Sequence, residues 1–105
     1  MSRHQTDEFA RAVHEVLTGL RRGELVSYGW VADEAGHPGA ARAVGAYLRS
    51  AHDAPNWWRV VAADGALIAP AAREQAERLR AEGHAVDDGR VLRKPERPGR
   101  PRRRA

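Results

Sequence analysis

Two short helices predicted close together in residues 27–51 restrict the possible folds more than any other segment. Ser27 is expected to cap the first helix, which runs over residues 28–35 and ends at Gly36. The second helix starts near Pro38, a residue that suits a first helical turn. Its apolar stripe consists of Val44, Leu48 and Ala51. Two helices with so short a connection are typical of a helix-turn-helix.

The other segments predict two more helices and short strands. An N-terminal helix is expected to begin at a Thr6 cap and to end at Gly23. A further helix after the hairpin around Asp64-Gly65 is expected to end at Gly83. Two β-hairpins are expected, with their turns at Asp64-Gly65 and Asp88-Gly89. We therefore expect a mainly α fold with small β-hairpins, organised as a winged helix-turn-helix.

The chain has 105 residues and no cysteine. This length allows one domain with one modest core. The lack of cysteine excludes disulfides, cysteine-based zinc sites and a thiol nucleophile. The five histidines do not have metal-site spacing, so we expect no metal and no cofactor. No segment approaches the ~20 apolar residues of a membrane span, and we expect a monomeric, cytoplasmic protein without membrane contact.

The net charge of +4 is unevenly distributed along the chain. Residues 90–105 carry eight basic side chains and one acidic side chain, whereas residues 1–89 carry ten basic and thirteen acidic ones. We therefore expect a DNA-binding domain over residues 1–94 and a basic, disordered tail over residues 95–105. Because the body is slightly acidic, DNA binding by the body must depend on particular residues and not on net charge.

The second helix of the pair carries mostly small side chains, where a helix that reads bases normally projects Arg, Asn or Gln. The small residues are Gly39, Ala40, Ala41, Ala43, Gly45 and Ala46. They allow close approach to a DNA groove, and they are equally compatible with tight packing against another helix. Arg42 is the single basic residue near the start of this helix. It could contact DNA, or it could be an ordinary surface arginine in contact with solvent. For Tyr28, the alternative is a core aromatic residue with its hydroxyl hydrogen-bonded.

Three stretches in unbroken order resemble the DNA-binding domain of the O6-alkylguanine-DNA alkyltransferases. Residues 23–49 (GELVSYGWVADEAGHPGAARAVGAYLR) are similar to the block of that family that contains its helix-turn-helix. Residues 57–67 (WWRVVAADGAL) are similar to the reactive-site block, in which Pro-Cys-His-Arg-Val precedes a turn with glycine. Residues 74–84 (EQAERLRAEGH) resemble the helix that follows it and ends in a Glu-Gly pair.

The resemblance implies roles for four residues at the DNA. Arg42 matches the arginine that enters the duplex and fills the space of the extruded nucleotide. Tyr28 matches the tyrosine near the 3′ phosphate that helps to rotate the nucleotide outward. Ala41 and Gly45 lie on the same helix as Arg42 and are expected to contact DNA with it.

The resemblance also implies a pocket for the extruded base, lined by Tyr28, Trp57, Arg59 and Val60. Trp57 stands where the family has its nucleophilic cysteine, and an indole cannot accept an alkyl group. The preceding proline of the family is Asn56 here, and its histidine is Trp58. Glu82 matches the glutamate of the hydrogen-bonded relay of the family, and without cysteine and histidine we expect it to remain as a structural acceptor.

Tryptophan in place of the reactive cysteine is similar to the alkyltransferase-like branch of the family. Such proteins bind double-stranded DNA that contains O6-alkylguanine, flip the damaged base out of the stack and mark it for nucleotide excision repair. Stacking of a base on an aromatic ring is worth about 1–3 kcal/mol, which suits an indole at the pocket wall. The segment that begins at Trp57 is expected to form a strand, so its side chains should alternate, with Trp57 at the pocket and Trp58 toward the core.

Two other functions fit parts of the sequence. A winged-helix regulator, specific or nonspecific for sequence, would bind DNA without recognising a lesion, but its recognition helix should carry polar base-reading side chains. A protein-interaction domain that has lost DNA binding fits the acidic body. A comparison of binding to O6-methylguanine and guanine in one duplex separates these functions from lesion recognition.

Overall fold

The computed structural model describes residues 3–51 and 53–99, with the backbone alone for residues 3–7. Helix α1 (Arg3–Thr18) packs its apolar face into the centre of the fold. Val13 and Leu17 on this face are fully buried, because they are spaced by one helical turn and face the same way.

Both predicted boundaries of the first helix are wrong. The helix starts before Thr6, whose side chain lies outside the described residues, and it ends at Thr18, well before Gly23. The carbonyl of Leu17 near this end accepts both the N–H of Leu20 at 3.0 Å and the side-chain amide of the distant Asn56 at 2.8 Å. Both bonds satisfy a carbonyl in the last turn, where helix carbonyls lack partners within the helix.

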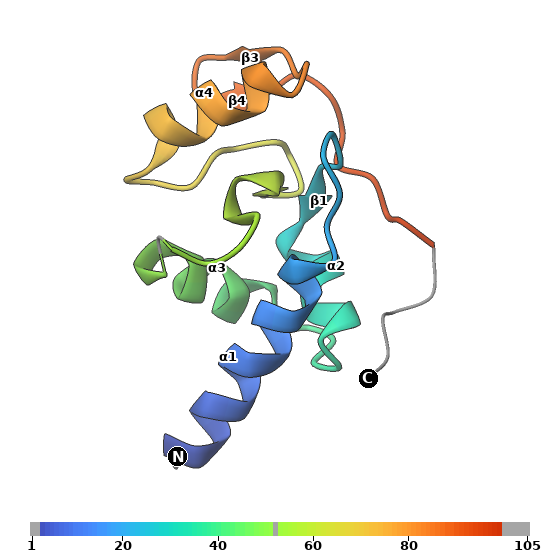
Figure 1. The fold of residues 1–105 in the computed structure, drawn as a ribbon, viewed down its shortest axis with the longest axis vertical. Coiled ribbons are helices and arrows are strands. Elements are labelled where there is room, and N and C mark those ends of the chain that lie inside the picture. Colours follow the sequence, from blue (N-terminus) through green and yellow to red (C-terminus); the bar gives the residue numbers. More distant parts are fainter. Residues whose placement is uncertain (1–2, 52, 100–105) are drawn as a thin grey trace.

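The helix-turn-helix consists of α2 (Tyr28–Glu34) and α3 (Ala41–Ser50). The predicted cap is confirmed, because the hydroxyl of Ser27 accepts the backbone N–H of Trp30 at 3.1 Å. Pro38, in contrast, lies in the turn before α3 and not in its first turn. In Figure 1 the two helices lie beside α1 in the same half of the molecule.

The hairpin predicted around Asp64-Gly65 does not form. Its first segment is the 3-10 helix η1 (Trp57–Arg59) followed by the short strand β2 (Val60–Val61). Strand β2 pairs in parallel with β1 (Val26–Ser27), and the chain after the turn forms a bridge to Arg90 instead. The N–H of Ala62 still donates to the carbonyl of Ala66 across the turn at 3.0 Å, but Gly65 and Leu67 are paired with Val91 and Gly89 of the distant β3–β4 hairpin.

The C-terminal half agrees with the sequence prediction more closely. Helix α4 (Ala72–Ala81) ends just before Gly83. Strands β3 (Val86–Asp87) and β4 (Arg90–Val91) pair in antiparallel fashion around Asp88 and Gly89, which both have positive φ angles, of 53° and 74°. This geometry is typical of an Asp-Gly hairpin turn. The fold class, mainly α with small strand pairs, is confirmed.

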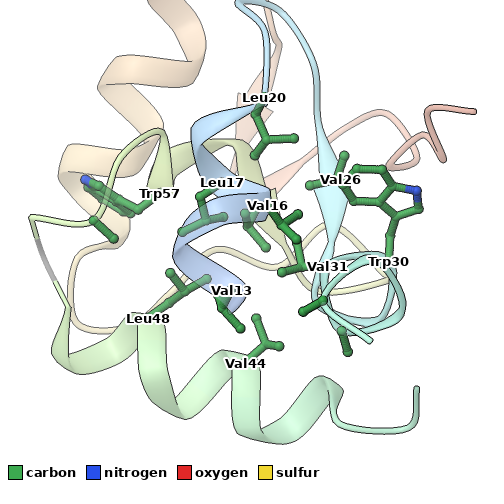
Figure 2. Packing of buried hydrophobic residues seen from close by; sticks show 14 of the residues in the cluster. Val13, Val16, Leu17, Leu20, Val26, Trp30, Val31, Val44, Leu48 and Trp57 are labelled. Atoms are coloured by element: carbon green, nitrogen blue, oxygen red, sulfur yellow. The ribbon is translucent and has the colours of Figure 1, made fainter. Parts of the chain in front are cut away.

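The buried apolar residues form two clusters. The larger cluster joins α1, α2, α3 and η1, and Figure 2 shows Trp57 and Trp30 at opposite ends of it, with Leu17 and Val16 between them. The smaller cluster lies under α4 and the β3–β4 hairpin and consists of Leu25, Val61, Leu79 and Val91. The first cluster therefore stabilises the helix-turn-helix, and the second supports the hairpin.

Residues 95–97 continue against the body of the protein. The backbone N–H of Glu96 donates to the carbonyl of Leu25 at 2.7 Å, and its carboxylate accepts the N–H of Leu25 at 3.3 Å. Arg97 forms an ion pair with Asp33 on α2 at 2.9 Å. Contacts with the body thus extend beyond Lys94, where the sequence suggests a domain boundary, whereas residues 100–105 lie outside the described residues.

Candidate nucleic-acid interface

Tyr28 is the first residue of α2, and its ring lies against α3. A Cβ atom added at Gly45 would be 3.6 Å from Cε2 of Tyr28 and 3.8 Å from Nη1 of Arg49. Burial raises the pKa of Tyr28, although the positive charge of Arg49 opposes this rise. The phenol therefore keeps its proton at neutral pH and can donate a hydrogen bond. Gly45 is buried, so its small size serves the contact between the two helices.

The outer face of α3 presents two arginines among small side chains, Arg42 in its first turn and Arg49 in its last turn. Arg42, Ala43 and Ala46 are exposed, whereas Ala41 is half-buried. The buried face of the helix contains Val44, Gly45 and Leu48. Alanines on the outer face let the helix axis approach another surface closely, and Arg42 projects beyond them. The structure therefore places Gly45 inside, where its small size serves helix packing, and leaves Ala43 and Ala46 on the exposed face, where contact with DNA stays a prediction.

Asn56 holds the reactive-site segment in place. Its φ angle is +56°, in the left-handed region, which asparagine tolerates and which the fixed φ of proline excludes. Its amide nitrogen donates to the carbonyls of Leu17 and Leu20, and its oxygen accepts from Arg59 Nη1 at 2.9 Å. The departure from the proline of the family at this position therefore gives η1 a side-chain anchor on the end of α1.

Trp57 belongs to the larger core cluster, and its side chain is 4% exposed. Its ring meets that of Trp58 edge to face, with 6.3 Å between centroids and 89° between planes. The predicted alternation of the two tryptophans is wrong, because residues 57–59 form a 3-10 helix and not a strand. Trp58 is half-buried and is thus the more exposed of the two.

Trp58 is fixed by charged groups. Its indole Nε1 donates to Glu82 Oε2 at 2.8 Å. The guanidinium carbons of Arg59 and Arg78 lie 5.0 and 4.7 Å from the centre of its ring. These distances are in the range of cation–π attraction. The ring is therefore held in one orientation beside Trp57.

Glu82 accepts hydrogen bonds from three residues. Arg59 donates through Nε and Nη2, the closest contact being 2.7 Å, and the backbone N–H of Gly23 donates at 2.8 Å. Trp58 supplies the third partner. Burial would raise the pKa of Glu82, but the hydrogen bonds from Arg59, Gly23 and Trp58 and the charge of Arg59 lower it to about 2. The carboxylate is therefore ionised at neutral pH.

Gln75 was not singled out in the sequence, yet it joins α4 to the reactive-site segment. Its side chain is fully buried; Nε2 donates to the carbonyls of Trp58 and Val60 at 3.1 and 2.8 Å, and Oε1 accepts from Ile68 N at 2.7 Å. Val60 is itself fully buried in β2. The available signal was a glutamine on the apolar face of α4, four residues before the buried Leu79.

The predicted site residues thus form two groups that share one core. Tyr28, Ala41, Arg42 and Gly45 lie on α2 and α3, and Trp57, Arg59, Val60 and Glu82 lie on or beside η1. Tyr28 packs against the cluster that contains Trp57. Among residues 3–51 and 53–99 there is no group of three side chains suited to hold a metal ion. No helix in that part of the chain has the length and apolar character needed to cross a membrane.

A helix-turn-helix whose second helix exposes alanines and arginines, followed by a short β-hairpin, is typical of a small winged-helix DNA-binding domain. The family model described as "6-O-methylguanine DNA methyltransferase, DNA binding domain" matches residues 8–84, and the chain belongs to this family.

Two similar curated proteins carry the name "DNA base-flipping protein", one from Escherichia coli (strain K12) and one from Shigella flexneri. Each is 36% identical to this chain over an alignment of 84 residues, which covers 76% of this chain and 65% of the relative. The chain therefore spans about two thirds of the length of these relatives.

A solved structure shows the same fold. It is the crystal structure of S. pombe Atl1 in complex with damaged DNA containing O6-carboxymethylguanine. The TM-score is 0.71 at 27% sequence identity, and the similarity covers 86% of this chain and 90% of that chain. The resemblance to the alkyltransferase-like branch inferred from sequence is confirmed.

Proposed function

We propose that this protein recognises O6-alkylguanine in double-stranded DNA and flips the damaged base out of the helix without removing the alkyl group. One observation carries the proposal: the chain retains the DNA-binding domain of the family but has no cysteine, and the sequence resemblance matches Trp57 to the reactive cysteine. The names of the relatives and the bound DNA of S. pombe Atl1 support it. Without a thiolate the alkyl transfer of the family has no acceptor.

In this proposal α3 enters the DNA with its small side chains. Arg42 is exposed and, within the described part of the chain, forms no ion pair, so its guanidinium is available to replace the everted nucleotide. Ala41 and Gly45 belong to the same contact, and the protonated hydroxyl of Tyr28 donates to a phosphate beside the lesion. Eversion costs a few kcal/mol, which the pocket contacts must offset.

The pocket for the everted base is proposed to lie beside η1. Trp57 forms its wall, with Tyr28, Arg59 and Val60 near it, because Trp57 replaces the residue that reacts with the base in the family. The low exposure of Trp57 suits a fixed wall better than a side chain that moves. Glu82 holds this wall through Trp58 and Arg59 and transfers no proton in the proposal.

A titration of fluorescent duplexes tests the proposal directly. Two duplexes that differ only in O6-methylguanine or guanine at one position are titrated with the protein by anisotropy, and alkyl transfer is assayed in parallel. We expect tighter binding to the lesion and no transfer. Equal affinity for both duplexes would contradict the proposal and would favour a winged-helix regulator without lesion recognition. Failure to bind either duplex would favour a protein-interaction domain.

We further propose that the bound complex marks the lesion for nucleotide excision repair and recruits its damage-recognition proteins. This part follows from the family resemblance. It is tested by comparing excision of an O6-alkylguanine duplex by purified repair proteins with and without the chain. No change in excision at saturating chain would contradict it. The cytoplasmic location and the monomeric state expected from the sequence stay predictions.

A further inference from the structure

A shallow hollow lies between the turn after β2 and the end of the β3–β4 hairpin. It encloses about 290 Å³, and its apolar lining consists of Ala63, Val91 and Leu92. Its charged lining consists of Asp64, Arg90, Arg93 and Lys94. None of these residues belongs to the proposed DNA site.

The backbone on both sides of the hollow is held by hydrogen bonds. Val91 N donates to the carbonyl of Gly65 at 2.9 Å, and Leu92 N donates to the carbonyl of Ala85 at 3.0 Å. Gly65 has a φ angle of +91°, and a Cβ atom there would lie 2.6 Å from the carbonyl oxygen of Val91. Only glycine allows this close approach, so the turn and β4 form one fixed surface.

The charges around the hollow do not cancel. Arg90 is paired with Asp64, since its Nη1 lies 2.7 Å from the carboxylate and 2.9 Å from the carbonyl oxygen of that residue. Arg93 has only an exposed contact with Glu96 at 3.3 Å. Lys94 is exposed and forms no ion pair with a described residue. Two cations therefore remain for a partner, because an exposed pair such as that of Arg93 contributes little.

Leu92 supplies an apolar contact beside these cations. Its side chain is 63% exposed, and it is the one large apolar side chain that residues 3–51 and 53–99 leave in solvent. Because its backbone is fixed by Ala85, the leucine stands at a defined place on the rim. Burial of this side chain by an apolar group of a partner would stabilise a complex, because it removes apolar surface from water.

The hollow lies away from the helix that is proposed to enter DNA. In Figure 1 the β3–β4 hairpin and α4 occupy one end of the long axis, whereas α3 lies in the other half with α1 and α2. A partner on the hairpin can therefore bind while α3 holds a duplex.

We propose that this hollow is a docking site for an acidic segment of a partner protein that carries an apolar side chain. The apolar side chain packs on Leu92 and Ala63, and carboxylates of the segment pair with Arg93 and Lys94. The C-terminus of this chain is not a suitable occupant, because its last six residues carry four arginines. A DNA backbone offers phosphates for the cations but nothing apolar to cover Leu92. The docking site is independent of the proposed lesion recognition.

The test uses a synthetic nine-residue peptide, a central leucine flanked by glutamates, added to the 15N-labelled full chain. We expect saturable shifts of backbone amide signals in residues 63–65 and 90–94. Leu92→Ser should lower the affinity of the chain for the peptide about tenfold. The double substitution Arg93→Ala with Lys94→Ala should lower it by a similar factor. A peptide with serine in place of its leucine should bind equally weakly. Arg11→Ala removes an exposed cation on α1 and should change the affinity less than about twofold.

Three outcomes would overturn the inference. The first is the absence of saturable shifts at about 5 mM peptide, a concentration that detects even weak binding. The second is a loss of duplex affinity in Leu92→Ser as large as the loss of peptide affinity, which would assign the hollow to DNA. The third is a dimer of the free chain that Leu92→Ser dissociates, which would assign the hollow to a second copy. Because Leu92 is exposed, melting temperatures of the variants should match that of the parent chain.

Discussion

Arg59 and Glu82 form a buried ion pair, with Nη2 of the arginine 2.7 Å from Oε2 of the glutamate and side chains that are 9% and 4% exposed. The pair connects the 3-10 helix that carries the reactive-site segment to the end of α4. Arg59 also donates to the carbonyl of Leu20, and Glu82 also accepts from Gly23, so the loop after α1 is held by the same pair. Glu82, which the sequence resemblance matches to the relay glutamate of the family, thus lies at a structural junction of three segments.

Glu82→Gln should destabilise the protein strongly. The substitution keeps the shape of the side chain but leaves the guanidinium of Arg59 buried without a counter-charge, which costs about 3–5 kcal/mol. Urea unfolding measures the loss. The matched control is Glu74→Gln, which removes an exposed pair with Arg78 and should cost less than about 1 kcal/mol. Similar losses in both variants would contradict a buried charge pair.

The Glu82 pair should also make stability depend on pH. The pKa of Glu82 is about 2 in the folded protein, below its ordinary value of 4.5. The unfolded chain therefore binds this proton more readily, and the contribution of Glu82 is complete above pH 4.5 and is lost as the pH falls toward 2. The shift corresponds to about 3 kcal/mol. The gap in unfolding free energy between parent and Glu82→Gln should narrow over this range, and a constant gap would refute the assignment.

Arg42→Ala should weaken binding to an O6-methylguanine duplex by about tenfold or more, because the guanidinium would no longer fill the space of the everted nucleotide. The melting temperature should hardly change, since the side chain is exposed. Anisotropy titration and thermal unfolding measure the two effects. Arg73→Ala on α4 removes another exposed cation and serves as the control. Normal binding by Arg42→Ala, or an unfolded variant, would contradict the proposed role.

Removal of the basic C-terminus should weaken binding to lesion and unmodified duplexes by the same factor. Truncation after Gly99 deletes four arginines, and the slope of log affinity against log salt should fall by about 0.9 for every phosphate that these arginines no longer neutralise. Titrations of lesion and unmodified duplexes at several salt concentrations measure this slope. Truncation after Lys94 should in addition lower the unfolding free energy by about 1 kcal/mol, because it removes the bonds of Glu96 to Leu25. A weakening confined to the lesion duplex would show that the tail has a different role.

Gly65→Ala should destabilise the protein by about 1–3 kcal/mol, because the new Cβ would meet the carbonyl of Val91 at 2.6 Å and the φ angle is +91°. Gly29→Ala is the matched control. Gly29 lies within α2, and the new Cβ there would be 3.9 Å from Ser27 Oγ, so alanine should be neutral or stabilising. Urea unfolding compares the two, and equal stabilities would contradict the close packing of the turn on β4.

The local signals in the sequence determined much of the fold. The Ser27 cap, the end of α4 before Gly83 and the Asp88-Gly89 turn all depend on interactions within a few residues, and each is present as expected. The family motifs placed the candidate site residues on α2, α3 and the reactive-site segment. Their roles at DNA stay predictions.

Only the tertiary structure decided how the reactive-site segment is held. Trp57 and Trp58 lie in a 3-10 helix whose start is held by Asn56, and Glu82 orients the Trp58 side chain. These bonds join residues 39 and 24 positions apart. Strand alternation and helix periodicity describe near neighbours alone, so they could not place the two indoles. The partners of buried polar groups are chosen by the packing of distant segments, which becomes known only when the whole chain is folded.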